Sequence, residues 1–212
     1  MERSSQADDA YRFVLEQLRN GEIGTGDKIV DKALSLKLRM SRMPAREALL
    51  RLVNEGYLVG TTRGFALPAH SRSDILDMFE VRRLLEPRAA ASAALILADE
   101  DLAALDAAYA RACKANAAGD VAGLKEANAA FRNIWLAAVP NRRLVDIVSR
   151  FFDHVLVIRS ITLEDKAARD VAVEMTKPLL ERFQARDSLA VHDQMEAFID
   201  AARASFLTFC PD

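Results

Sequence analysis

The glycines of this chain of 212 residues are distributed very unevenly. Six of the eight lie in its first third: Gly21, Gly24, Gly26, Gly56, Gly60 and Gly64. Glycine favours turns and weakens helix interiors, so this part should consist of short elements. The remainder is rich in Ala and almost free of Gly, which favours long helices. We therefore predict a mainly α protein with a small head at 1–69 and an all-α body at 70–212.

Apolar residues recur at helical spacing in three segments of the head. The first segment ends at Gly21, and the third begins after Ser41, a good N-cap residue, and stops at Gly56. The second is a short helix over 31–38, which should turn three apolar residues inward: Ala33, Leu34 and Leu38. A tight turn at 38–40 then separates the last two helices.

A β-hairpin is expected directly after the third helix. Two short β-forming runs, 57–59 and 65–67, flank a glycine-rich turn at 60–64. Three helices with a tight turn between the last two, followed by a hairpin, form a winged helix-turn-helix. This is the fold that we predict for the head.

The body shows helical periodicity throughout, with Asp99, Asp120 and Asp187 as natural helix starts. Apolar stripes of the kind that pack into a bundle include Leu95, Leu102, Leu105, Phe131, Ile134, Trp135 and Ala138. We predict a bundle of six or seven helices, six of them over 72–97, 99–118, 120–138, 141–163, 165–185 and 187–207.

Several features indicate a cytoplasmic protein. No apolar run approaches the roughly 18 residues that cross a bilayer. The polar, acidic N-terminus has no features of a secretory signal. Cys113 and Cys210 match no metal or redox spacing, as is usual for reduced cysteines. We expect no membrane partner and no cofactor.

The net charge is −2, but the charge is unevenly spread. Seven Lys and Arg residues lie within 28–51, against only Asp31 and Glu47. Arg42 and Arg46 are four residues apart and therefore adjacent on one helix face. An Arg fork can bond O6 and N7 of a guanine together, and the first-turn amides of the helix can bind a phosphate. This stretch is either a solvated helix face or a DNA-contacting surface.

The same residues resemble the GntR family of regulators. The resemblance rests on Gly21 to Ile29, Asp31 to Leu49, Arg51-Leu52, Glu55-Gly56 and Gly64-Phe65. Past the linker at Pro68 to Ser71, residues 80–90 resemble the opening of the FadR-type sensor domain. The family implies a homodimer that binds a palindromic operator in double-stranded DNA. It usually represses, and an organic acid or related metabolite alters its DNA affinity.

The resemblance also implies which residues contact DNA. Arg42 and Arg46 match the base-reading arginines of the family. Met43 departs from the Thr of most relatives, so we expect a different operator sequence. The expected DNA-contacting residues are Lys37, Arg39, Ser41, Arg42, Met43 and Arg46, together with the wing residues Thr61, Thr62, Arg63 and Gly64.

The body departs from the family at its metal site. Many relatives hold a divalent ion through an Asp-x-x-Phe-His pattern and two later histidines. Here the pattern reads Asn128 to Arg132, and counting from Asp187 places Thr176 and Phe198 at the later positions. Arg repels a cation, and Thr and Phe do not normally hold one. His154 and His192 match neither position, so we predict no metal site of the family type.

Arg132 could supply the positive charge that the metal otherwise provides. Arg82 matches an arginine that relatives direct at a ligand carboxylate, so two guanidiniums would favour an anionic effector. The effector-contacting residues expected on this basis are Arg82, Asn128, Arg132, Thr176 and Phe198.

Three alternatives remain open. Either arginine could pair with Glu86, Glu174 or another acid, which would leave the cavity apolar or closed. The body could have lost ligand binding and serve only dimerisation. An enzyme on a helical scaffold has least support, because no nucleophile stands beside a His motif and no phosphate loop is present. An enclosed polar cavity lined by Arg82 and Arg132 would distinguish the sensor from the dimerisation module.

Overall fold

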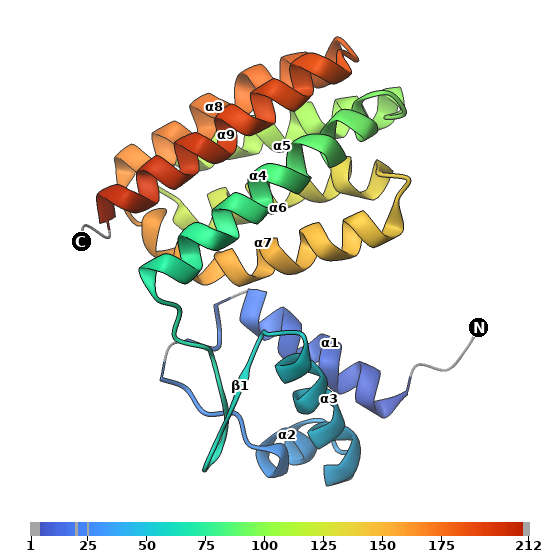
Figure 1. The fold of residues 1–212 in the computed structure, drawn as a ribbon, viewed down its shortest axis with the longest axis vertical. Helices are drawn as coiled ribbons and strands as arrows, with labels where there is room; N and C mark the ends of the chain where they lie inside the picture. The colour runs from blue at the N-terminus through green and yellow to red at the C-terminus, as the bar shows by residue number, and fades with distance from the viewer. Residues whose placement is uncertain (1–4, 20, 25, 210–212) are drawn as a thin grey trace. The chain divides into compact units, whose positions relative to one another are not determined.

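The computed structural model describes residues 5–19, 21–24 and 26–209, with the side chains of 154–161 and 209 excepted. The chain forms two compact units, Met1–Ser71 and Arg72–Asp212 (Figure 1). The first unit is called the head below, and the second is called the body.

The described residues of the head form three helices and one hairpin, which confirms the winged helix-turn-helix. The helices are α1 (Gln6–Arg19), α2 (Asp31–Lys37) and α3 (Arg42–Asn54). Strand β1 (Val59–Thr61) pairs antiparallel with β2 (Gly64–Ala66). The segment before α2 adds an isolated antiparallel bridge between Ile29 and Phe65. The hairpin is therefore attached to the rest of the head on one edge.

The head core is built from the apolar faces of the helices and the hairpin. Its most deeply buried members are Ala10, Val14, Ala45, Ala48, Leu49, Leu52 and Leu58. Full burial of a Leu or Val side chain contributes about 1.5–3 kcal/mol, so this cluster supplies most of the stability of the head. α3 thus has a buried back that holds it against the other helices.

Two local expectations for the head were wrong. Ala33 is exposed, whereas Asp31 and Ser35 are buried. The inward face of α2 follows residues 31, 34, 35 and 38, which share one side of a helix, and Ala33 lies off that side. The hairpin turn is also tighter than expected, since β1 continues to Thr61 and only two residues separate the strands.

Over its described residues, 72–209, the body is a bundle of six helices. They are α4 (Arg72–Ala94), α5 (Asp99–Ala118), α6 (Val121–Ala138), α7 (Arg142–Thr162), α8 (Lys166–Gln184) and α9 (Ser188–Phe209). α4 packs against α9, α7 and α6, while α5 packs against α6 and α8 (Figure 1). Among the described residues, the helices include none that combines the length and apolarity needed to cross a bilayer.

Aromatic side chains fill the centre of the bundle. Trp135 stacks on Phe183 with 6.4 Å between ring centroids, and Phe131 also approaches Phe183 at 6.4 Å. Leu105, Phe131 and Trp135 are buried, as the stripes predicted. Leu95 is 63% exposed, which contradicts the expectation. α4 ends at Ala94, so Leu95 leaves the helical phase and Leu97 occupies the buried position instead.

Candidate DNA-binding surface and effector cavity

The leading end of α3 presents two arginines and a methionine to solvent. The Arg42 and Arg46 side chains are 64% and 59% exposed, and Met43 is 79% exposed. Ser41 occupies the N-cap position, and its side chain makes no capping hydrogen bond within the described part of the chain. The amides of the first turn can therefore receive an external acceptor such as a phosphate oxygen.

Both arginines converge on one carboxylate. Asp31, the first residue of α2, accepts hydrogen bonds from Nη2 of Arg42 at 3.0 Å on each of its oxygens. Nη1 of Arg46 lies 3.7 Å from Oδ2 of Asp31. Burial alone raises the pKa of Asp31, but the hydrogen bond from Arg42 and the nearby charges outweigh it, so the pKa lies below its ordinary value. The sequence analysis missed this residue, whose only signal was an acid in a basic stretch.

The remaining residues expected to contact DNA occupy the start of the turn and the wing. Nζ of Lys37 lies 4.8 Å from the Phe13 ring centroid, and Arg39 adopts a positive φ of 53° in the turn before α3. In the wing, Thr61 Oγ1 donates to the Gly64 carbonyl at 3.0 Å. The two residues of the hairpin loop, Thr62 and Arg63, are exposed. The wing therefore offers a donor-rich, solvated tip.

Gly64 has a structural task in that wing. Its φ is +127°, and a Cβ built there would lie 2.5 Å from the carbonyl oxygen of Ile29. Only glycine allows the hairpin to approach the backbone of Ile29 so closely. The close approach to Ile29 is a reason for glycine at position 64 that does not depend on DNA.

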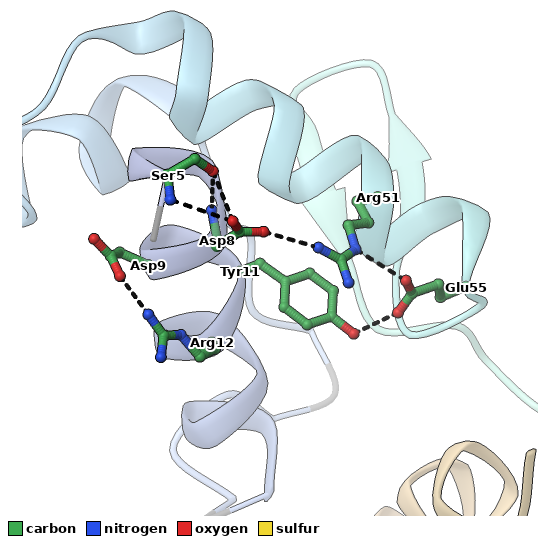
Figure 2. A network of polar contacts seen from close by, with 7 residues as sticks. All are labelled: Ser5, Asp8, Asp9, Tyr11, Arg12, Arg51 and Glu55. Carbon is green, nitrogen blue, oxygen red and sulfur yellow. Dashed lines mark hydrogen bonds and ion pairs between the residues drawn. The ribbon is translucent and has the colours of Figure 1, made fainter. Parts of the chain in front are cut away.

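A polar network fixes the far half of α3 to α1 (Figure 2). Arg51 donates to Glu55 and Asp8, each at 3.1 Å, and its guanidinium lies 4.1 Å from the Tyr11 ring centroid. Tyr11 donates its hydroxyl proton to Glu55. Burial, and then this hydrogen bond to a carboxylate, raise the pKa of Tyr11 above its ordinary value. Arg51 therefore belongs to the scaffold that orients α3 and differs in this respect from Arg42 and Arg46.

The body contains a cavity where helices α4, α6, α8 and α9 meet. It encloses about 420 Å³ of space between side chains, part of it open to solvent. Its lining includes all five residues expected to contact an effector, Arg82, Asn128, Arg132, Thr176 and Phe198. The rest of the lining consists of Glu86 and of five aromatic or aliphatic side chains: Phe131, Trp135, Phe152, Leu179 and Met195. The cavity is mainly apolar, with a few polar groups.

The two arginines in this cavity have different surroundings. Arg82 is 3% exposed and forms a forked pair with Glu86, at 2.6 Å from Nε to Oε1 and 3.4 Å from Nη2 to Oε2. This is the pairing that the sequence analysis held as an alternative, and it neutralises Arg82. Arg132 places its Cζ 3.2 Å from the Phe152 ring centroid, a cation–π contact.

The other two polar side chains of the cavity, Thr176 and Asn128, differ in whether they have a hydrogen-bonding group available for a ligand. Thr176 donates its hydroxyl proton to the Ala172 carbonyl at 2.7 Å. The amide nitrogen Nδ2 of Asn128 is buried and finds no hydrogen-bond partner among the described residues. A buried amide without a partner is costly, so a bound acceptor at this point would be favourable.

The family's metal positions lie together here but do not fit a divalent ion. Asn128, Arg132, Thr176 and Phe198 all line the cavity. Arg132 brings a fixed positive charge, Thr176 uses its hydroxyl on the helix backbone, and Phe198 has no donor atom. Within the described residues no group of three His, Cys, Asp or Glu side chains could hold a metal ion. The side chain of His154 lies outside the described residues.

A winged helix-turn-helix joined to a helical unit with an internal cavity defines the class of two-domain DNA-binding transcription regulators. Comparison with protein families agrees: the bacterial regulatory proteins of the gntR family match residues 6–64, and the FCD domain matches residues 77–201. The chain belongs to the gntR family and carries an FCD domain.

Two characterised relatives match parts of the chain. The Nta operon transcriptional regulator of Aminobacter aminovorans is 36% identical over 81 residues, which cover 38% of this chain and 39% of the relative. The HTH-type transcriptional regulator McbR of Escherichia coli (strain K12) is 33% identical over 117 residues, 55% of this chain and 53% of McbR. The matched segments therefore span about half of these relatives or less.

Solved structures match over nearly the full chain. E. coli McbR superposes with a TM-score of 0.83 at 23% identity, covering 98% of this chain and 99% of McbR. A GntR regulator from Rhodococcus sp. RHA1 superposes with a TM-score of 0.80 at 16% identity, covering 97% and 99%. At these identities the likeness establishes the fold of both units.

Proposed function

We propose that the protein is a cytoplasmic, ligand-responsive repressor that binds a palindromic DNA operator as a homodimer. The observation that carries the DNA-binding role is the exposed pair Arg42 and Arg46 at the leading end of α3, a helix whose opposite side is buried. A rigidly held helix can enter the major groove with its N-terminal turn, and two guanidiniums there can each bond a guanine edge. The two-fold symmetry of a homodimer would match the two-fold symmetry of a palindromic operator.

To test base recognition, the full chain is used to select the duplexes that it binds from a random pool. The affinity for the selected operator is then measured by titration. Arg42→Ala and Arg46→Ala should each lose about 1–3 kcal/mol of binding free energy and relax the preference for a guanine. The logarithm of affinity should also fall steeply with the logarithm of salt concentration.

Arg12→Ala is the matched control, because it removes an exposed arginine that pairs with Asp9 on α1. It should reduce the affinity for all duplexes slightly and leave the sequence preference intact. Unchanged specificity in both α3 variants would refute the assignment of Arg42 and Arg46.

For the body, we propose that the cavity binds a small carboxylate through Arg132 and the Nδ2 amide of Asn128. Arg82 supports this site as a neutral pair with Glu86, so charge recognition falls mainly to Arg132. Arg132 lines the cavity with its guanidinium against the Phe152 ring, and a guanidinium can form charge-assisted hydrogen bonds with a carboxylate. The apolar remainder of the lining suits a ligand whose body is hydrophobic.

Thermal shift against a panel of carboxylates tests this role. At least one acid should raise the unfolding temperature of the wild type, because a ligand that binds only the folded state stabilises that state. Arg132→Ala should lose that shift, whereas Arg111→Ala, on an exposed part of α5 outside the cavity, should keep it. Equal shifts in all three proteins would remove Arg132 from the site. A flat response of the wild type would favour the body as a dimerisation module alone.

A further inference from the structure

The carboxylate of Asp31 is buried against the surface that α3 presents. Its side chain is only 8% exposed, although the arginines that cover it are more than half exposed. Burial of an acid is costly unless it is paired, and Asp31 is paired with two cations from another helix. It receives a further hydrogen bond from the backbone of Lys32. Asp31 is thus held firmly from its own helix and faces α3.

We propose that Asp31 is a positioning residue that sets the sequence specificity of DNA binding by aligning Arg42 and Arg46. The proposal rests on the proposed function, because it assigns a role to an acid behind the base-reading arginines. Asp31 fixes both guanidiniums on one side of α3 before DNA arrives. Arranging long side chains in advance reduces the ordering that binding must otherwise impose.

The hydrogen-bond geometry permits base contact at the same time. A guanidinium carries five N–H donors, and a guanine edge engages two of them. Asp31 uses Nη2 of Arg42 and lies beside Nη1 of Arg46. Each arginine therefore retains donors for a guanine while its position is held by the acid. An exposed guanidinium without such a holder would sample many rotamers and bond phosphates as readily as bases.

The charge of Asp31 has a second effect, which acts on binding to every duplex. The two arginines and the aspartate together carry a net charge of about +1 instead of +2, which weakens attraction to the phosphate backbone. That attraction is independent of sequence and supplies nearly all of non-specific binding. Asp31 therefore lowers this sequence-independent part of the affinity for every duplex, and the ratio of the operator affinity to the affinity for other DNA depends on the alignment of the arginines.

The experiment compares the affinity of the full chain for its selected operator and for a scrambled duplex of equal length and composition. Asp31→Asn keeps the size and one acceptor oxygen but removes the charge. We expect the ratio of the two affinities to fall at least about tenfold, with tighter binding to the scrambled duplex and a steeper salt dependence.

Glu47→Gln is the matched control. Glu47 is the exposed acid on α3 next to Arg46, and it has no hydrogen bond or ion pair among the described residues. Its removal changes the charge of the same helix by the same amount. Both affinities should rise together, so that their ratio stays within about twofold of the wild type.

A double-variant comparison separates positioning from a structural effect. In the Arg42→Ala, Arg46→Ala background, Asp31→Asn should no longer change the affinity ratio, because nothing remains to be aligned. An unchanged ratio in Asp31→Asn alone would overturn the proposal, as would a parallel loss of both affinities with a lowered unfolding temperature. If the wild-type protein binds all duplexes with equal affinity, the proposed function itself is wrong. That outcome is distinct from a failure of the Asp31 proposal, which requires a wild type that prefers its operator.

Discussion

Met43 is a large apolar side chain with an unusual position. It is the second residue of α3, it is 79% exposed, and it lies between the two arginines in sequence and one helical turn from Arg46. Exposure of an apolar group at a DNA-reading end has a physical use, because the 5-methyl group of thymine is the apolar feature of the major groove. Under the proposed function, we expect Met43 to contact a thymine in each half-site.

Replacing single operator thymines by deoxyuridine tests this contact, because the change removes only the methyl group. The wild type should lose about fourfold in affinity at one position in each half-site, the equivalent of roughly 0.8 kcal/mol for one buried methylene-sized group. Met43→Ala should bind both duplexes equally. Leu36→Ala, which removes a similarly exposed apolar side chain on α2, should still discriminate as the wild type does. A methyl effect that persists in Met43→Ala would exclude the contact.

At the residue scale, the sequence predicted what periodicity and charge determine. The exposure of Arg42 and Arg46 and the burial of Leu49 and Leu52 follow from helical spacing on α3. The burial of Asp31 could not be predicted in that way, since it depends on two arginines that lie eleven and fifteen residues further along the chain. Apolar spacing alone placed Ala33 inward, where the folded helix places an acid.

At the element scale, the wing depends on one glycine. Gly64→Ala should destabilise the head by about 1–3 kcal/mol, because the new Cβ would clash with the Ile29 carbonyl and the positive φ disfavours a side chain. Chemical denaturation of the full chain, followed by a probe in the head, measures the loss. Gly60→Ala is the control in the same hairpin: a Cβ there meets nothing within 4 Å, so the change should stay within about 0.5 kcal/mol. Equal costs for the two variants would contradict the steric argument.

The helices of the body were predictable to within a few residues because their ends carry local signals. Asp120 and Asp187 each accept a hydrogen bond from the backbone three residues on, at 2.9 Å and 3.0 Å. Asp99 begins α5, as predicted, but it is not the N-cap: Ala98 occupies that position, and Asp101 accepts a hydrogen bond from the Ala98 amide at 3.0 Å. Asp99, Glu100 and Asp101 follow one another, so the sequence does not show which residue is the N-cap.

At the scale of the whole molecule, two units and their fold classes followed from the glycine distribution and from helical periodicity. The cavity did not follow from either. Its residues come from positions as far apart as Arg82 and Phe198, and only the resemblance to a family indicated that they would meet. The pairing of Arg82 with Glu86 was one of several options, because spacing along a helix permits the pair but does not show that both side chains are sealed inside.

That sealed pair constrains how this lineage can change. A descendant that loses Arg82 keeps a buried carboxylate without its cation, and one that loses Glu86 keeps a buried cation without its carboxylate. Breaking such a pair from one side typically costs about 3–5 kcal/mol, a large fraction of the stability of an ordinary domain. The two positions should therefore be inherited as a unit, and any new ligand preference has to arise by substitutions around them.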